Sequence, residues 1–194
     1  MQTTLYLARH GETDWNKQQR LQGQLNSELT KQGIAQSIAL ANHLQSKKIT
    51  TIVSSPLGRA VITAQHCERI LNIPWVSNLA LVERDFGDWQ GQMLTELSAN
   101  AHYTEILQQY THAQPPNGES AITCGQRIYQ GLLTLAQAYL NQHILVIFHG
   151  EALRCFMNYA GWPTQQNAYQ LFANANVLAI TYSPTKPYFE QVTP

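Results

Sequence analysis

Residues 5–16 read LYLARHGETDWN, and this stretch decides the fold that the rest of the sequence predicts. An apolar run over residues 5–8 ends abruptly in Arg9-His10-Gly11, and polar residues follow. The pattern indicates a buried strand whose C-terminal end presents a guanidinium, an imidazole and a glycine at one edge of a sheet. Ligands of open α/β sheets bind at that edge. A cation beside an imidazole favours an anionic ligand there, with phosphate the leading candidate.

The composition fits one globular domain over residues 1–194. Hydrophobic residues make up 44% of the chain, which is enough for a full core. Formal net charge is zero, so bulk charge indicates neither a nucleic-acid nor a membrane-surface partner. We see no signal-peptide pattern and no apolar run near the ~18 residues of a membrane span, so we expect a cytoplasmic protein. Buried free thiols are expected at Cys67, Cys124 and Cys155.

Predicted strands and helices alternate along the chain. Strands are expected at residues 4–8, 50–54, 75–82, 144–148, 177–182 and 188–192, and helices over 31–46, from 57 onward, over 119–140 and over 151–160. Thr30 is the expected N-cap of the first helix, with Ile34 and Ile38 on its sheet-facing side. We therefore predict an α/β fold of three layers, with a mostly parallel central sheet flanked by helices. A weaker helical stretch at about 90–118 is expected to form a small cap insertion.

Three of the predicted strands end in residues suited to phosphate chemistry. If these strands are parallel neighbours, their ends place two imidazoles and two guanidiniums around one point. Arginine forks bind phosphate oxygens, and glycine lets backbone N–H groups approach a phosphate. One imidazole can attack phosphorus while the other stabilises charge. The residues are Arg9, His10 and Gly11 after the first strand, Arg59 after the second, and His149 and Gly150 after the strand at 144–148.

Proton transfer completes this chemistry. Nearby guanidiniums disfavour an imidazolium, which keeps a nucleophilic lone pair available at neutral pH. The leaving alkoxide still requires a proton, and Glu83, at the end of its own predicted strand, is placed to give one. Glu12 and Asp14 are rival donors because both lie near His10 in sequence.

Six motifs in order resemble the histidine phosphatase superfamily, which includes cofactor-dependent phosphoglycerate mutases. They are RHGETDWN (9–16), RLQGQLNSELTKQG (20–33), SSPLGRAVITA (54–64), LVERDFGDWQG (81–91), PNGES (116–120) and VIFHG (146–150). The resemblance implies a mostly parallel sheet flanked by helices, a variable cap and no metal. Two departures from the family pattern are Val82-Glu83-Arg84, where many relatives have arginine before the acid, and the loop at 174–177.

The resemblance also implies roles for the site residues. His10 becomes the phosphohistidine, and Arg9, Arg59 and His149 complete the phosphate pocket. Glu83 becomes the proton donor, in preference to Glu12 and Asp14. Asn16, Gln22 and Gly23 match positions that contact the transferred phosphate or shape its loop. Arg154 is expected either in a salt bridge or on the helix surface, or as support for the pocket. The other histidines are expected to be ordinary surface or core residues: His43, His66, His102, His112 and His143.

The favoured function is a metal-independent phosphomonoesterase that acts on a small phosphorylated metabolite without a cofactor. The short segment between Glu83 and His149 favours the short phosphatase-type relatives, including those acting on α-ribazole phosphate, over true mutases. A phosphoglycerate mutase-type transfer is the main alternative. A non-catalytic phospholigand-binding module is another. A metal site built on His10, Glu12, Asp14 and His149 is a third, but arginines facing a dication would be unfavourable.

Overall fold

A six-stranded sheet forms the centre of the computed structural model, which describes residues 2–162, 174 and 176–192. The strand order is β3-β2-β4-β1-β5-β6. Neighbours among β1 to β4 run parallel, whereas β5 lies antiparallel to β1 and β6 antiparallel to β5. The strands are β1 (Thr3–Arg9), β2 (Thr51–Ser54), β3 (Trp75–Ser77), β4 (His143–Phe148), β5 (Val177–Ser183) and β6 (Lys186–Gln191). The predicted α/β class with a mostly parallel sheet is confirmed.

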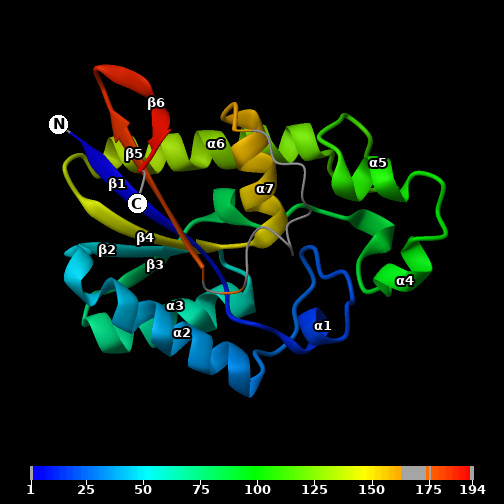
Figure 1. Cartoon of the computed structure of the whole chain (residues 1–194), viewed down its shortest axis with the longest axis horizontal. Coiled ribbons are helices and arrows are strands. Elements are labelled where there is room, and N and C mark those ends of the chain that lie inside the picture. Colours follow the sequence, from blue (N-terminus) through cyan, green and yellow to red (C-terminus); the bar gives the residue numbers. More distant parts are fainter. Residues whose placement is uncertain (1, 163–173, 175, 193–194) are drawn as a thin grey trace.

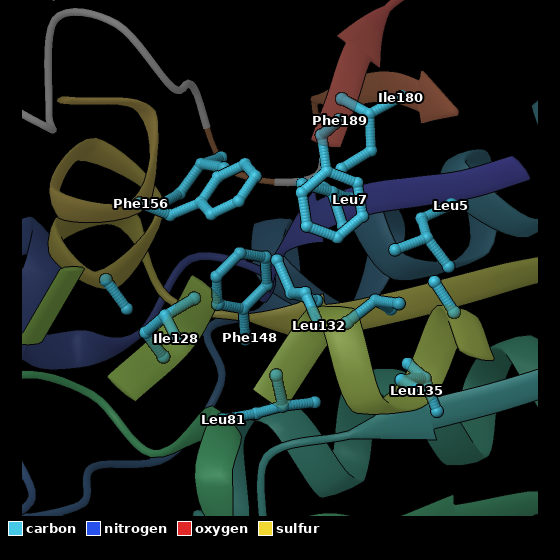
Figure 2. Packing of buried hydrophobic residues seen from close by; sticks show 14 of the residues in the cluster. Leu5, Leu7, Leu81, Ile128, Leu132, Leu135, Phe148, Phe156, Ile180 and Phe189 are labelled. Atoms are coloured by element: carbon cyan, nitrogen blue, oxygen red, sulfur yellow. The ribbon is translucent and has the colours of Figure 1, made fainter. Parts of the chain in front are cut away.

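Helices cover both faces of the sheet, which gives three layers (Figure 1). α2 (Lys31–Leu44) and α3 (Gly58–Leu71) lie on one face, and α6 (Ala121–Ala138) and α7 (Gly150–Tyr159) on the other. Alternate residues of β1 enter the two cores: Leu5 and Leu7 pack toward α6 and α7, and Tyr6 and Ala8 toward α2 and α3. Figure 2 shows the first of these cores, in which side chains of α6 interdigitate with those of β1 and β4.

Short elements gather at the end of the molecule opposite the N-terminus (Figure 1). They are α1 (Asp14–Lys17), α4 (Leu94–Leu97) and α5 (Tyr103–Gln108), and α4 and α5 fall inside the weak helical stretch predicted at 90–118. A small separate core holds this region together, formed by Leu21, Phe86, Trp89, Leu97 and Ile106. We refer to residues 86–118 below as the cap segment.

Two details of the predicted elements are wrong. β3 ends at Ser77 instead of continuing to 82, because the Asn78 side chain accepts from the Ala80 N–H and starts a 3-10 turn, η2 (Leu79–Leu81). On α2, Ile34 and Ile38 are more than a third exposed, and Gly33 and Ser37 face inward instead. The reason is that the backbone of Gly11 and Glu12 packs directly against this face of α2. A Cβ at Gly33 would lie 2.0 Å from the Glu12 carbonyl oxygen, so a larger side chain does not fit there.

Other expectations hold, apart from the start of the last strand. The Thr30 hydroxyl accepts from the Gly33 N–H and caps α2, as predicted. Cys67, Cys124 and Cys155 are free and buried. The terminal strand β6 begins at Lys186, two residues earlier than predicted. Among the described residues, none of the helices has the length and apolar character that crossing a membrane requires.

Candidate active site

The ends of β1, β4 and β2 meet at one edge of the sheet because these strands are parallel neighbours. The sheet's hydrogen-bond ladder continues one residue past the strands. His10 N–H donates to the Phe148 carbonyl at 3.0 Å, and Ser55 N–H donates to the Ile147 carbonyl at 2.9 Å. The backbone that carries these functional side chains is therefore fixed by the centre of the sheet.

His10 is held in one tautomer by its neighbours. Its Nδ1 lies 2.7 Å from the Gly11 carbonyl oxygen, which can only accept a hydrogen bond, so Nδ1 carries the proton. Its Nε2 lies 3.2 Å from Arg59 Nε, which can only donate, so Nε2 carries the lone pair. Burial, followed by the charges of Arg59 and Arg9, holds the pKa of His10 well below its usual value. The ring is thus neutral, with its nucleophilic nitrogen defined.

Arg59 lies in the first turn of α3 and is almost fully buried. Its two terminal nitrogens donate to the carbonyls of Leu25 at 2.7 Å and Gly23 at 2.6 Å, in the loop that precedes α2. Gly23 has a φ of +55°, a left-handed conformation that favours glycine. A single guanidinium therefore joins the His10 imidazole to the loop at 23–25.

His149 lies beside His10, with the two ring centroids 5.3 Å apart. Its Nε2 is 2.8 Å from the Ser55 hydroxyl, and its buried Nδ1 has no hydrogen-bond partner among the described residues. Burial and the charge of Arg59 lower the pKa of His149 well below the usual range. His149 is fully buried and is not among the residues that line the cavity described below.

Glu83 is the buried carboxyl group of the site. Its Oε1 accepts from the N–H groups of Arg84 and Ala152, both at 2.8 Å, and its Oε2 accepts from Glu151 N–H at 3.4 Å. These last two donors belong to the first turn of α7, so the carboxyl group caps that helix. Burial raises the pKa of Glu83, although the Arg59 charge and the backbone donors oppose the rise.

One cavity brings most of the predicted residues together. Its lining includes Arg9, His10, Asn16, Gln22, Gly23, Arg59, Glu83 and Gly150. Asn16 and Gln22 both contact Thr13, and both lie in the segment between β1 and α2 that forms one wall. Gly150 allows close packing, because a Cβ there would lie 3.2 Å from Arg9 Nε. Of the predicted set, only His149 does not reach the cavity surface.

The rival proton donors lie elsewhere. Glu12 accepts from the Thr30 hydroxyl at 2.7 Å, Asp14 is exposed, and neither lines the cavity. The hypothetical metal set of these two carboxylates with His10 and His149 is therefore not assembled. Within the part of the chain that the structure describes, no group of three or more His, Cys, Asp and Glu side chains is arranged to hold a metal ion.

A buried ionic triad connects the cap segment to α7, and sequence reasoning missed most of it. Glu151 Oε1 accepts from Arg84 Nη1 at 2.9 Å and Arg154 Nη2 at 2.6 Å, and both guanidiniums are fully buried. Burial by itself would raise the pKa of Glu151, but the charges of Arg154 and Arg84 lower it. Arg84 also donates to the Ile106 carbonyl of α5 at 2.7 Å. The i,i+3 spacing of Glu151 and Arg154 predicts only half of this triad.

The loop at 174–177 reaches the site through one residue. Asn174 Nδ2 donates to the His10 carbonyl at 2.9 Å and lies 3.4 Å from Asn16 Oδ1. Ala175 lies outside the described residues. The departure from the family pattern therefore still leaves an amide against the backbone of the predicted nucleophile.

A cavity lined by one histidine, two arginines and a buried carboxyl group, with a second histidine ring beside the first, defines a phosphoryl-transfer class of site. The chain belongs to the histidine phosphatase superfamily (branch 1), which it matches over residues 5–193. It is 34% identical over 155 residues to the uncharacterized phosphatase PhoE of Bacillus subtilis, covering 80% of this chain and 76% of PhoE. It is 29% identical over 181 residues to a probable phosphoglycerate mutase, GpmB of Yersinia pestis, covering 92% and 84%.

Solved structures agree on the fold. YhfR of Bacillus stearothermophilus has a TM-score of 0.88 and 26% identity, covering 98% of this chain and 96% of that one. A phosphoserine phosphatase of Entamoeba histolytica, crystallised with 3-phosphoglyceric acid, has a TM-score of 0.84 and 26% identity, covering 98% and 95%. Family membership and the phosphatases among these relatives support phosphatase activity for this chain.

Proposed function

We propose that the protein is a metal-independent phosphomonoesterase that hydrolyses small phosphate esters through a phosphohistidine on His10. One observation carries the proposal: a neutral imidazole with its lone pair on Nε2 shares a cavity with a buried carboxyl group of raised pKa. The first group can attack phosphorus and the second can deliver a proton. Residues 1–194 then act as one domain, with the segment at about 90–118 as a cap over the cavity.

In the first step, His10 Nε2 attacks phosphorus and the ester P–O bond breaks. The Glu83 carboxyl proton passes to the leaving oxygen, so the alcohol leaves neutral. In the second step, water attacks phosphorus, the P–N bond breaks, and the Glu83 carboxylate takes the water proton. Arg9 and Arg59 bind the phosphoryl oxygens, and we assign His149, whose ring lies beside that of His10, to stabilising the same charge. The hydrogen bond from Nδ1 to the Gly11 carbonyl holds the ring in the attacking tautomer throughout.

Trapping the intermediate tests this proposal. Rapid acid-free quenching during turnover of ³²P-labelled ester should leave label on the protein that is stable to alkali and labile to acid, as expected for phosphohistidine. His10→Ala should lose the label and nearly all turnover, because the attacking nitrogen is gone. Retained turnover within tenfold of the parent would contradict the mechanism. Full activity after exhaustive chelation is the expected result for the metal-independent reaction.

Phosphoglycerate mutase-type transfer is the second candidate, because a relative of 29% identity is named a probable mutase. It uses the same covalent step but passes the phosphoryl group to a second hydroxyl instead of water. Assaying 3-phosphoglycerate with catalytic 2,3-bisphosphoglycerate separates the two reactions. Isomerisation faster than release of inorganic phosphate would favour the mutase.

A further inference from the structure

We propose that the substrates of this site are phosphate monoesters of uncharged, largely apolar alcohols, and that esters with a carboxylate or a second phosphate are poor substrates. The inference rests on the proposed function and adds to it the chemistry of the leaving group. It follows from two features of the cavity: the side chains on its cap side, and the location of every basic side chain in the sequence.

The cap side of the cavity is apolar or neutral. Leu21, Phe86, Leu94 and Leu107 supply aliphatic and aromatic surface. Tyr103 and Gln108 add a hydroxyl and an amide, each able to bind a neutral polar group. An alcohol that leaves from the phosphoryl group at His10 enters this part of the cavity. An apolar leaving group that contacts this surface removes apolar area from water, which favours its binding.

Among the described residues, basic side chains reach the cavity only at its phosphoryl end. Of the 12 lysines and arginines in the sequence, Arg9 and Arg59 are the two in the cavity lining, and both lie beside His10. Arg84 and Arg154 are fully buried and bound to Glu151. Arg127 pairs with Glu119.

The remaining cations also lie outside the lining. Arg20 donates to the Gly91 carbonyl and lies over the Trp15 ring, 5.5 Å from its centroid. The others are exposed: Lys17, Lys31, Lys47, Lys48, Arg69 and Lys186. Residues 163–173 and 175, outside the described part of the chain, contain no lysine, arginine or histidine. They can therefore add no cationic side chain to the site.

A second anionic group on the substrate would meet carboxyl groups instead of cations. Besides the phosphoryl-binding end, the charged lining consists of Glu83 and Glu151. Glu151 is held ionised by its two arginine partners, and both guanidiniums are bound to its carboxylate. A substrate carboxylate would lose water on entering and gain no counter-ion, which costs binding free energy. The cavity therefore discriminates against phosphoglycerate-like and phosphoserine-like esters.

Paired substrates test the inference without changing the chemistry of the leaving oxygen. For the charge, 3-phosphoglycerate is compared with its methyl ester, and we expect kcat/KM to be at least about tenfold higher for the methyl ester. For the apolar contact, ethyl phosphate is compared with 2-phenylethyl phosphate, and we expect kcat/KM to be about thirtyfold higher for the latter. Equal or higher kcat/KM for the free carboxylate would overturn the inference.

A matched pair of variants places the effect in the cap segment. Gln108 and Gln109 are consecutive and both exposed, but only Gln108 lines the cavity. Gln108→Arg should shift the preference between the free acid and its methyl ester toward the acid by at least about threefold, because it supplies the missing cation. Gln109→Arg should leave this preference unchanged. Equal preferences in the two variants would count against the assigned location of the leaving group.

Failure of this inference and failure of the proposed function give different results. If no ester is hydrolysed, including p-nitrophenyl phosphate, the proposed function fails and the inference fails with it. If esters are hydrolysed and His10→Ala abolishes the reaction, the proposed function stands. A preference for the free carboxylate in that case rejects the substrate class alone.

Discussion

At the phosphoryl end of the cavity, which we call the sheet end, Arg9 and His10 end or follow β1 and Arg59 lies in the helix after β2. Both strands lie in the middle of the sheet, where backbone hydrogen bonds from both sides fix their positions. On the cap side, most of the lining comes from α4 and α5, which have four and six residues and pack on a small core of their own. In the first region, few residues can be replaced without disrupting the sheet. The second can change its side chains and keep the fold.

This contrast separates two tasks of an enzyme. The sheet end binds the phosphoryl group, which is common to every phosphate ester, while the cap segment contacts the alcohol, which differs between esters. The two regions meet at α7, where Glu83 caps the helix and Glu151 binds Arg84 and Arg154. Changes at the sheet end should therefore affect all esters alike, and changes in the cap segment should alter the ranking of esters.

The largest effect is expected from Arg59, which contacts both His10 Nε2 and the loop at 23–25. Arg59→Ala should lower kcat/KM by at least about a thousandfold, because the developing phosphoryl charge loses a forked donor. Ethyl and 2-phenylethyl phosphates should lose the same factor. A changed ratio between the two would break the proposed division between regions. A circular dichroism spectrum like that of the parent controls for misfolding.

Removing the ionic link between the regions comes next. Glu151→Gln should lower the free energy of unfolding by about 3 kcal/mol, because it leaves two buried guanidiniums without a counter-charge. Limited proteolysis should then cut first within residues 98–118. Urea unfolding measures the stability. Glu190→Gln, which breaks the exposed pair with Lys186, is the control and should leave the midpoint unchanged.

If limited proteolysis of Glu151→Gln cleaves at sites spread evenly along the chain, the result would contradict the idea that the triad holds the cap segment to α7. So would an unfolding midpoint equal to that of the control variant.

Glu83 lies where the regions meet, so its effect should depend on the ester. Glu83→Gln should slow alkyl esters by about a hundredfold, because an alkoxide leaves poorly without a proton. Aryl esters, whose leaving oxygen needs less help, should slow by less than about tenfold. Steady-state kinetics on ethyl and p-nitrophenyl phosphates gives both numbers. Equal losses on the two would remove Glu83 from the role of acid.

The sheet end is easier to predict from sequence than the cap side, for a physical reason. Arg9, Arg59 and His149 each follow a strand or start a helix, and parallel neighbours must bring those ends together. Cap positions such as Leu94 and Leu107 have no such constraint, because short helices without strong periodicity can pack in many ways. Arg84 lies far along the chain from Glu151 and Arg154, and no local pattern encodes its pairing with Glu151.

The error in the predicted inward face of α2 also has a physical cause. Periodicity places Ile34 and Ile38 inward, since apolar side chains usually face a sheet. The loop that carries His10 passes too close for them, and only Gly33 and the small Ser37 fit there. The Ser37 hydroxyl donates to the Gly33 carbonyl at 2.7 Å, so its polar group is satisfied within the helix. A functional loop has thus taken the space that a larger hydrophobic core would otherwise use.

The smallest effect concerns the pH dependence of stability, which has its source at the sheet end. The folded pKa values of His10 and His149 lie well below the ordinary value of 6.5, so the unfolded chain binds protons first as pH falls. The contribution of these two histidines to the free energy of unfolding is therefore fully present above pH 6.5. It is lost below that pH, by up to about 1.4 kcal/mol per pH unit for each histidine. Glu83 acts in the opposite direction, because its raised pKa lets the folded state take up a proton first.

We therefore expect urea unfolding between pH 7 and 5 to show how steeply the free energy of unfolding falls as the pH falls. This fall should be shallower for His149→Gln and steeper for Glu83→Gln than for the parent. The sign of each change follows from which state binds the proton, so the two variants must move apart. If both slopes equal that of the parent, the buried groups at the sheet end do not titrate as their surroundings require. The sheet end would then differ from the cap segment in geometry alone, and the neutral, attacking form of His10 would need another cause.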